Sequence, residues 1–195
     1  MRTLVYPLAA AAALLVALAV PTPAMAAPAN RYTSQALSAG VSRVQADGLQ
    51  QKINDYLAAH GGRQVAANKV EFPGGVYTAT VPGELSVRDL SVKAMAANPP
   101  SDHCLGQGQY AYNGWFCAYR SANFQGDELQ WYNCGRYGMP WGGTGSWVNN
   151  QTQGTPAYLI NSNLSVLVQS FAYDSRSSYN WTPVWYVDVC YEGHL

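Results

Sequence analysis

Histidine is the side chain that most often carries acid–base or metal chemistry near neutral pH, and this chain has three, at His60, His103 and His194. None of them is spaced from a metal-binding partner or a nucleophile in a known motif. His103, beside Cys104, is the one histidine that we would test for a triad assembled by the fold with a serine and an aspartate. The histidines therefore predict no catalytic and no metal-binding residue.

Asp127 and Glu128 are the most closely spaced pair of acids in the aromatic-rich part of the chain. Acid–base catalysis needs two carboxylates facing each other across a cleft. Neighbouring residues of a strand point to opposite faces of a sheet, so this pair does not meet that need. We interpret the two acids as a solvent-exposed strand edge that discourages strand addition, and we expect the protein not to be an enzyme.

Four cysteines could form disulfides or bind zinc, and all of them lie in the second half of the chain, at Cys104, Cys117, Cys134 and Cys190. No pair has the two-residue spacing of a typical zinc site, and thiols of an exported protein oxidise. Two disulfides are expected, with three pairings open. We favour Cys104–Cys117 and Cys134–Cys190, because they join the start of the domain and the last strand to one hairpin. No metal ion or cofactor is expected.

The six tryptophans all lie at or after Trp115, and they could form a glycan-stacking surface, a protein interface or a core. Trp131 and Trp185 alternate with polar neighbours, so we expect both to be buried. Trp141 lies in a glycine-rich loop over residues 135–145 and is the best candidate for exposure. The residues that we expect to contact a partner are Gly135, Tyr137, Pro140 and Trp141.

The first 26 residues have the features of a signal peptide. Arg2 is followed by a mostly apolar run over 4–20, and Ala24-Met25-Ala26 supplies small residues for cleavage. The alternative is a membrane anchor, for which this run is at the lower limit of length. We expect a secreted, extracellular protein without a membrane contact after cleavage. Zero formal net charge argues against a nucleic-acid partner.

Composition changes near residue 100, where an alanine-rich part without tryptophan gives way to an aromatic-rich part. We divide the chain into a signal peptide (1–26), an N-terminal segment with a linker (27–100) and a C-terminal domain (101–195). In the N-terminal segment we expect an unstructured stretch over 27–46 and a helix from an N-cap at Asp47 to Gly61. Two strands, 65–72 and 76–81, should follow around a Pro-Gly-Gly turn. This segment either docks on the C-terminal domain or is a weakly structured pro-region.

The C-terminal domain reads as short aromatic strands between turns, which predicts an all-β, antiparallel sandwich or barrel. Its clearest element is a β-hairpin over 115–134, with a polar turn at 120–126. Further strands are expected at 146–149, 157–160, 165–171 and 184–191. A weak repeat at an offset of 39 residues relates Tyr119 to Tyr158, which two packed Greek-key units would explain.

The hairpin carries a recognisable motif: an aromatic, four residues, an aromatic, one residue and a glycine, at Tyr119, Phe124 and Gly126. This motif resembles the first motif of the βγ-crystallin fold. Its setting, FCAYRSANFQG followed by Cys134-Gly135, is similar to the secreted Streptomyces metalloproteinase inhibitor family. The resemblance covers residues 103–191. It implies a monomeric two-Greek-key sandwich that binds and blocks an extracellular peptidase. The alternative from the aromatic composition is a module that binds cell-wall glycan.

Overall fold

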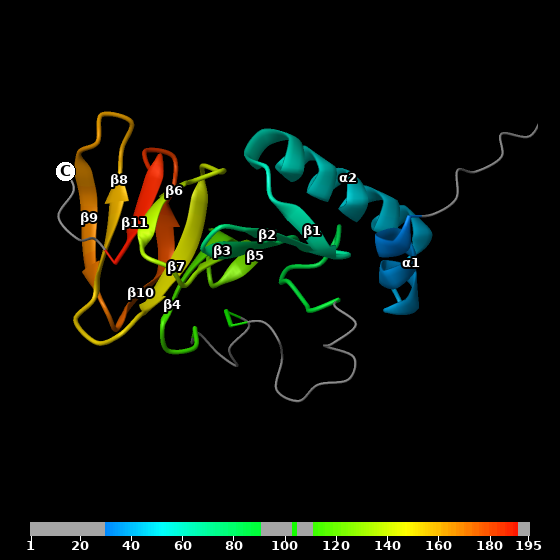
Figure 1. Cartoon of the computed structure of the whole chain (residues 1–195), viewed down its shortest axis with the longest axis horizontal. Helices are drawn as coiled ribbons and strands as arrows, with labels where there is room; N and C mark the ends of the chain where they lie inside the picture. Colours follow the sequence, from blue (N-terminus) through cyan, green and yellow to red (C-terminus); the bar gives the residue numbers. More distant parts are fainter. Residues whose placement is uncertain (1–29, 91–102, 105–110, 191–195) are drawn as a thin grey trace, which may run out of the picture.

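Two antiparallel β-sheets form the framework of residues 30–90, 103–104 and 111–190, the parts of the chain that the computed structural model describes (Figure 1). The all-β class predicted from the sequence is confirmed, since these residues hold eleven strands and two helices. The N-terminal elements are α1 (Arg31–Ser38), α2 (Arg43–His60), β1 (Arg63–Ala66), β2 (Lys69–Phe72) and β3 (Gly75–Thr78). The others are β4 (Trp115–Ser121), β5 (Gln125–Trp131), β6 (Gly135–Gly138), β7 (Thr144–Asn150), β8 (Pro156–Ile160), β9 (Val166–Phe171), β10 (Asp174–Asn180) and β11 (Tyr186–Val189).

The strand order shows an exchange between the two sheets. One sheet has seven strands in the order β1-β2-β3-β5-β4-β7-β10, and the other has four in the order β6-β11-β8-β9. Strand β6 therefore leaves β4, β5 and β7 and lies in the four-stranded sheet with β8, β9 and β11. In return, β10 lies in the seven-stranded sheet beside β7. The result is a pair of Greek-key-like units whose sheets each contain a strand of the other.

The predicted hairpin over 115–134 is present as β4 and β5, with Phe116 opposite Trp131 and Tyr119 opposite Glu128. The turn between the two strands is stabilised by Ser146 of the neighbouring strand β7. The Ser146 hydroxyl accepts a hydrogen bond from the Phe124 amide at 2.8 Å and donates to the Ser121 carbonyl at 2.7 Å. Gly126 has a φ of +82°, a conformation that glycine adopts without steric cost.

The N-terminal elements extend the larger sheet, because β3 pairs with β5 from Gly75–Trp131 to Thr78–Glu128. Of the two expectations for this segment, docking is therefore the one that the described residues display. Residues 65–72 do not form the single strand that we predicted. The chain turns at Ala67-Asn68 between β1 and β2, and the buried Asn68 side chain donates hydrogen bonds from its amide to the Ala79 and Arg88 carbonyls.

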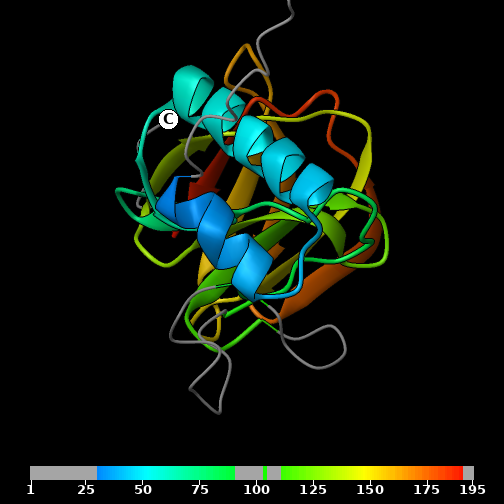
Figure 2. The same ribbon diagram turned by 90° about the vertical axis from the view of Figure 1, so that its right-hand side faces the viewer.

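The predicted helix begins earlier than the sequence pattern indicated, and a second, unpredicted helix precedes it. The N-cap of α2 is Ser42, which forms a capping box with Gln45, whereas Asp47 lies inside the helix and pairs with Arg43 at 2.9 Å. The stretch expected to be unstructured contains α1, whose first amides are capped by the Asn30 side chain. Figure 2 shows both helices lying over the strands of the larger sheet.

The main hydrophobic core runs from the helices to the last strand, and a smaller cluster surrounds the Cys104–Cys117 disulfide. The main core includes Leu49 and Ile53 of α2, Trp131 of β5 and Val187 of β11, and these side chains expose 1% or less of their surface. The predicted boundary near residue 100 and the signal peptide lie outside the described residues. No helix within those residues has the length and apolar character needed to cross a bilayer.

The two disulfides are the ones favoured from the sequence. Cys104 bonds to Cys117 with their Cα atoms 5.9 Å apart, and Cys134 bonds to Cys190 with theirs 4.8 Å apart. The first joins the segment before β4 to β4 itself, and the second joins the end of the hairpin to the end of β11. Both lie within the C-terminal part of the chain.

The interpretation of Asp127 and Glu128 as a solvent-exposed edge is wrong. Asp127 exposes 1% of its surface and Glu128 exposes none. β5 is not an edge strand, since β3 covers the side that the C-terminal strands leave open. A local sequence pattern cannot reveal this neighbour, because β3 lies about fifty residues earlier in the chain.

Candidate functional site

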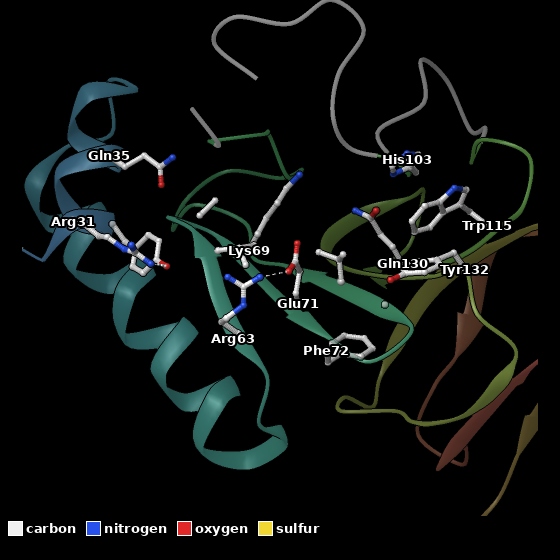
Figure 3. A pocket seen from close by; sticks show the side chains of 15 residues that line it. Arg31, Gln35, Arg63, Lys69, Glu71, Phe72, His103, Trp115, Gln130 and Tyr132 are labelled. Atoms are coloured by element: carbon white, nitrogen blue, oxygen red, sulfur yellow. Dashed lines mark hydrogen bonds and ion pairs between the residues drawn. The ribbon is translucent and has the colours of Figure 1, made fainter. Parts of the chain in front are cut away.

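A groove of about 870 Å³ crosses the outer face of the seven-stranded sheet (Figure 3). Its floor is formed by β2, β3 and β5, one end by α1 and β1, and the other end by the start of β4 and the residue pair 103–104. The lining residues are Arg31, Tyr32, Gln35, Arg63, Val65, Ala66, Lys69, Glu71, Phe72, Gly75, Val76, His103, Trp115, Gln130 and Tyr132.

Strand register explains why these side chains share a face. Glu71 lies opposite Val76, and Val76 lies opposite Gln130, so the three form one row across neighbouring strands. Side chains that are opposite each other in an antiparallel sheet point to the same side. The alternating residues, such as Tyr77 and Leu129, point to the other side and are part of the core. The floor of the groove is thus the face of the sheet that points away from the core, and it combines charged, amide and apolar side chains.

Aromatic rings form one end of the groove. The His103 ring stacks on Trp115, with ring centroids 4.1 Å apart and planes 9° from parallel, and Tyr132 lies 4.8 Å from Trp115 in a tilted arrangement. The disulfide of Cys104 to β4 holds His103 in this place, and the Tyr119 hydroxyl donates to the Cys104 carbonyl at 2.8 Å. The Tyr132 side chain is about half exposed, so its ring is available to a ligand.

Charged side chains form the middle and the opposite end. Arg63 pairs with Glu71 at 2.8 Å, and both are exposed, so this pair contributes little to stability and can exchange partners. Lys69 pairs with Asp89 at 3.0 Å, and both of these side chains are buried. Figure 3 shows Arg31 and Gln35 of α1 at the end opposite Trp115 and Tyr132.

Two hydrogen bonds attach α1 to the end of the groove. The Tyr32 hydroxyl donates to the Gln64 carbonyl, and the Gln35 side chain accepts a bond from the Ala67 amide at 2.7 Å. The helix therefore closes the free edge of β1 and presents Arg31 beside it. Because both walls of the groove are fixed by such contacts, a ligand would find the site largely formed.

The lining residues provide stacking surfaces and hydrogen-bonding groups. Glu71 is the only carboxylate in the described lining, and it is paired with Arg63, so the groove does not hold two facing acids. Within the described residues, no three His, Cys, Asp or Glu side chains come together in a way that could hold a metal ion. The arrangement suits recognition of a polar ligand that also has a flat apolar surface.

The residues predicted to contact a partner do not line this groove. Gly135–Gly138 is strand β6, in which Tyr137 lies opposite Val187 and stacks on Trp131 at 5.7 Å. Trp141, the best candidate for exposure among the tryptophans, is buried: this side chain exposes 9% of its surface and packs in the core near Tyr77. Pro140 is half-buried beside it. Whether a partner contacts this loop stays a prediction.

Trp185 is exposed, although the sequence pattern predicted that it would be buried. It was expected in the core, yet 57% of its surface is exposed. The residue precedes β11 instead of alternating within it, and its amide donates to the Ile160 carbonyl at 2.8 Å. The alternating pattern of buried residues was assumed to include Trp185, but the strand begins at Tyr186, so the pattern does not apply to the Trp185 side chain.

Of the residues discussed from the sequence, His103 and Trp115 belong to the groove, where their rings stack on each other. The floor residues were missed because the sequence argument placed the N-terminal segment in a separate unit. The alternation of polar residues at Lys69 and Glu71 could have indicated that one face of this short strand is polar. It could not have indicated that β5 lies in the same sheet. Comparisons with family models, curated proteins and solved structures found no match for this chain.

Proposed function

We propose that this protein is an extracellular, non-catalytic binding protein with a βγ-crystallin-like pair of Greek keys. Two observations support the fold assignment. The units β4–β7 and β8–β11 exchange their third strands, and the motif rings of Tyr119 and Phe124 meet edge to face at 5.6 Å above the turn that contains Gly126. The two disulfides support an oxidising, extracellular location.

The ligand that best fits the groove is a glycan. Sugar rings have an apolar face that stacks on aromatic side chains, and hydroxyl groups that hydrogen-bond with planar amide, guanidinium and carboxylate groups. The groove places Trp115 and Tyr132 at one end and Gln130, Glu71 and Arg63 along the floor beyond them. This combination of rings and planar polar groups on one face is the observation that carries the proposal.

The dimensions of the groove fit a short oligosaccharide. A volume of about 870 Å³ lies within the range of about 300–1,000 Å³ that is typical of small-molecule sites. A site of this size holds a few sugar rings, so a polysaccharide would bind through a short segment of its chain. Cell-wall glycans, chitin and cellulose are accordingly the substances to test first.

The test is co-sedimentation of the full oxidised chain with insoluble peptidoglycan, chitin and cellulose. Tyr132→Ala removes an exposed ring from the groove and should weaken binding about 30-fold, the loss typical of an aromatic hot-spot residue. Trp185→Ala is the matched control, because it removes an exposed aromatic ring outside the groove and should leave binding unchanged. No binding to any glycan, or equal losses in the two variants, would refute the groove as a glycan site.

Inhibition of an extracellular metallopeptidase is the second candidate function. It is favoured by the strand exchange, which supports the family resemblance from which this function was inferred. If it is correct, the full chain should slow a thermolysin-type peptidase at a one-to-one ratio. Activity that is unchanged over a panel of secreted peptidases would eliminate this candidate and leave the glycan proposal untouched.

A further inference from the structure

Strand β9 is an edge strand with an apolar surface. It has one neighbour in the four-stranded sheet, β8, and its sequence VLVQSF contains neither a charged residue nor a proline. Three of its large apolar side chains are exposed: Val166 by 40%, Leu167 by 39% and Phe171 by 52%. An uncharged edge of this kind is a template for pairing with another strand.

The other three sheet edges in the described residues are protected. The edge at β1 is closed by α1, through the bonds from Tyr32 and Gln35 described above. The edge at β10 carries Arg176, and its Ser177 carbonyl accepts a bond from the Asn123 amide at 2.7 Å. The edge at β6 is four residues long and carries Arg136. β9 differs from these edges in having no charged residue and no covering helix, and the bulge in its ladder with β8 leaves residues 168–171 regular.

The pairing of β9 with β8 shows which backbone groups of β9 point to its neighbour and which point to the free edge. The Ala172 amide, just after β9, donates to the Thr155 carbonyl at 3.1 Å. Bonded pairs alternate along an antiparallel ladder, so the backbone groups of Ser170 also point to β8. Those of Gln169 and Phe171 point away from it, and Pro156, which has no amide hydrogen, lies opposite Phe171. The free edge therefore presents the backbone groups of Gln169 and Phe171.

We propose that β9 pairs with β9 of a second copy of this chain, antiparallel and with Gln169 on the two-fold axis. In this register Gln169 forms a bonded pair with Gln169 of the partner copy. A bulge in the β8–β9 ladder between Val166 and Val168 limits this register to residues 168–171, in which Val168 lies opposite Ser170 of the partner copy. The exposed Phe171 ring of each copy then lies on the face of the joined sheet that carries the Gln169 pair, one on either side of the axis. A second copy fits because the edge is uncharged and complementary to itself under a two-fold rotation.

This interface is separate from the groove. β9 lies at the end of the molecule opposite α1 and α2, as Figure 1 shows. Pairing through β9 would join the two four-stranded sheets into one and leave both grooves open. The inference differs from the monomer expected from the family resemblance, and it does not depend on the nature of the groove ligand.

The first test measures the molar mass of the full oxidised chain by sedimentation over a concentration series. The mass should rise from that of one chain, 21.1 kDa if no residue has been removed, towards twice that value. Gln169→Lys places two like charges beside the axis and should keep the protein monomeric. Ser178→Lys puts the same charge on the exposed edge of β10 and should dimerise as the unmodified chain does.

The second test reads out the register. Residues of a bonded antiparallel pair have Cα atoms about 5.5 Å apart, a separation that a disulfide spans. Gln169→Cys should therefore give a covalent dimer on oxidation, and Ser178→Cys should not. The proposal is overturned if the unmodified chain stays monomeric at every concentration, if Gln169→Lys dimerises normally, or if the two cysteine variants cross-link equally.

Discussion

Asp127 is the residue at which the N-terminal and C-terminal parts of the chain meet through charge. Its buried carboxylate, on β5, pairs with Lys52 of α2. It also accepts hydrogen bonds from the Thr80 amide at 2.9 Å, the Thr80 hydroxyl at 2.7 Å and the Tyr77 hydroxyl at 3.1 Å. Such a buried carboxylate is tolerated because its oxygens are satisfied from several directions.

The ionisation of Asp127 is linked to folding. Burial raises the pKa of this carboxyl, but the Lys52 ammonium and the hydrogen bonds from Thr80 lower it further, and the net pKa lies below the usual 3.8. Because the folded pKa is the lower one, the ionised carboxylate stabilises the folded state above the unfolded pKa. This contribution is lost as the pH falls through 3.8 towards the folded pKa.

Asp127→Asn should reveal this linkage. At neutral pH the free energy of unfolding should fall by about 3 kcal/mol, near the lower end for breaking a buried pair, because Lys52 keeps some contact with water. Below about pH 5 the variant should lose less stability on acidification than the unmodified chain does. Denaturant unfolding at a series of pH values measures both effects. Asp47→Asn, in an exposed pair with Arg43, is the control and should change neither.

If the free energy of unfolding falls equally steeply with decreasing pH in Asp127→Asn and in the unmodified chain, Asp127 is not the group that links ionisation to folding. The loss at neutral pH alone would not be enough, because an amide could also disturb the packing around Thr80. The difference in pH dependence is therefore the decisive result.

Among the elements, the hairpin β4–β5 was the most predictable, since alternation and turn residues are local properties of the sequence. Leu129 and Trp131 share a face, as the period of two predicts, and both are buried. The pairing of β5 with β3 was not predictable in this way. It depends on a contact between distant parts of the chain, and it reverses the environment expected for Asp127 and Glu128.

Helix α1 illustrates a different kind of limit. Its eight residues are too few for a stable isolated helix, so propensity alone gives little signal. The Asn30 cap and the attachment to β1 through Tyr32 and Gln35 stabilise it. The groove was also unpredictable from local sequence, because α1, β2, β5 and His103 lie far apart in the chain and each supplies part of the lining. Of its lining, only His103 and Trp115 had been considered from the sequence.

At the scale of the whole molecule, the N-terminal elements and the C-terminal sandwich share one core and one sheet. The β3–β5 ladder, the Lys52–Asp127 pair and the stack of Tyr56 on Tyr77, with ring centroids 3.8 Å apart, all hold residues 30–90 in place. No disulfide links the two parts, since both disulfides lie after residue 103. The association is therefore noncovalent apart from the connecting chain.

This arrangement predicts what happens if the connection is cut. With a specific protease site introduced between residues 91 and 102, the cleaved fragments should stay together in gel filtration under native conditions. They should separate in denaturant without reductant, because no sulfur bond joins them. Separating them in native buffer would expose the edge of β5 and leave Asp127 without Lys52, which is why they should remain associated. If the N-terminal fragment is released in native buffer, the segment instead behaves as a detachable pro-region, the alternative that the sequence left open.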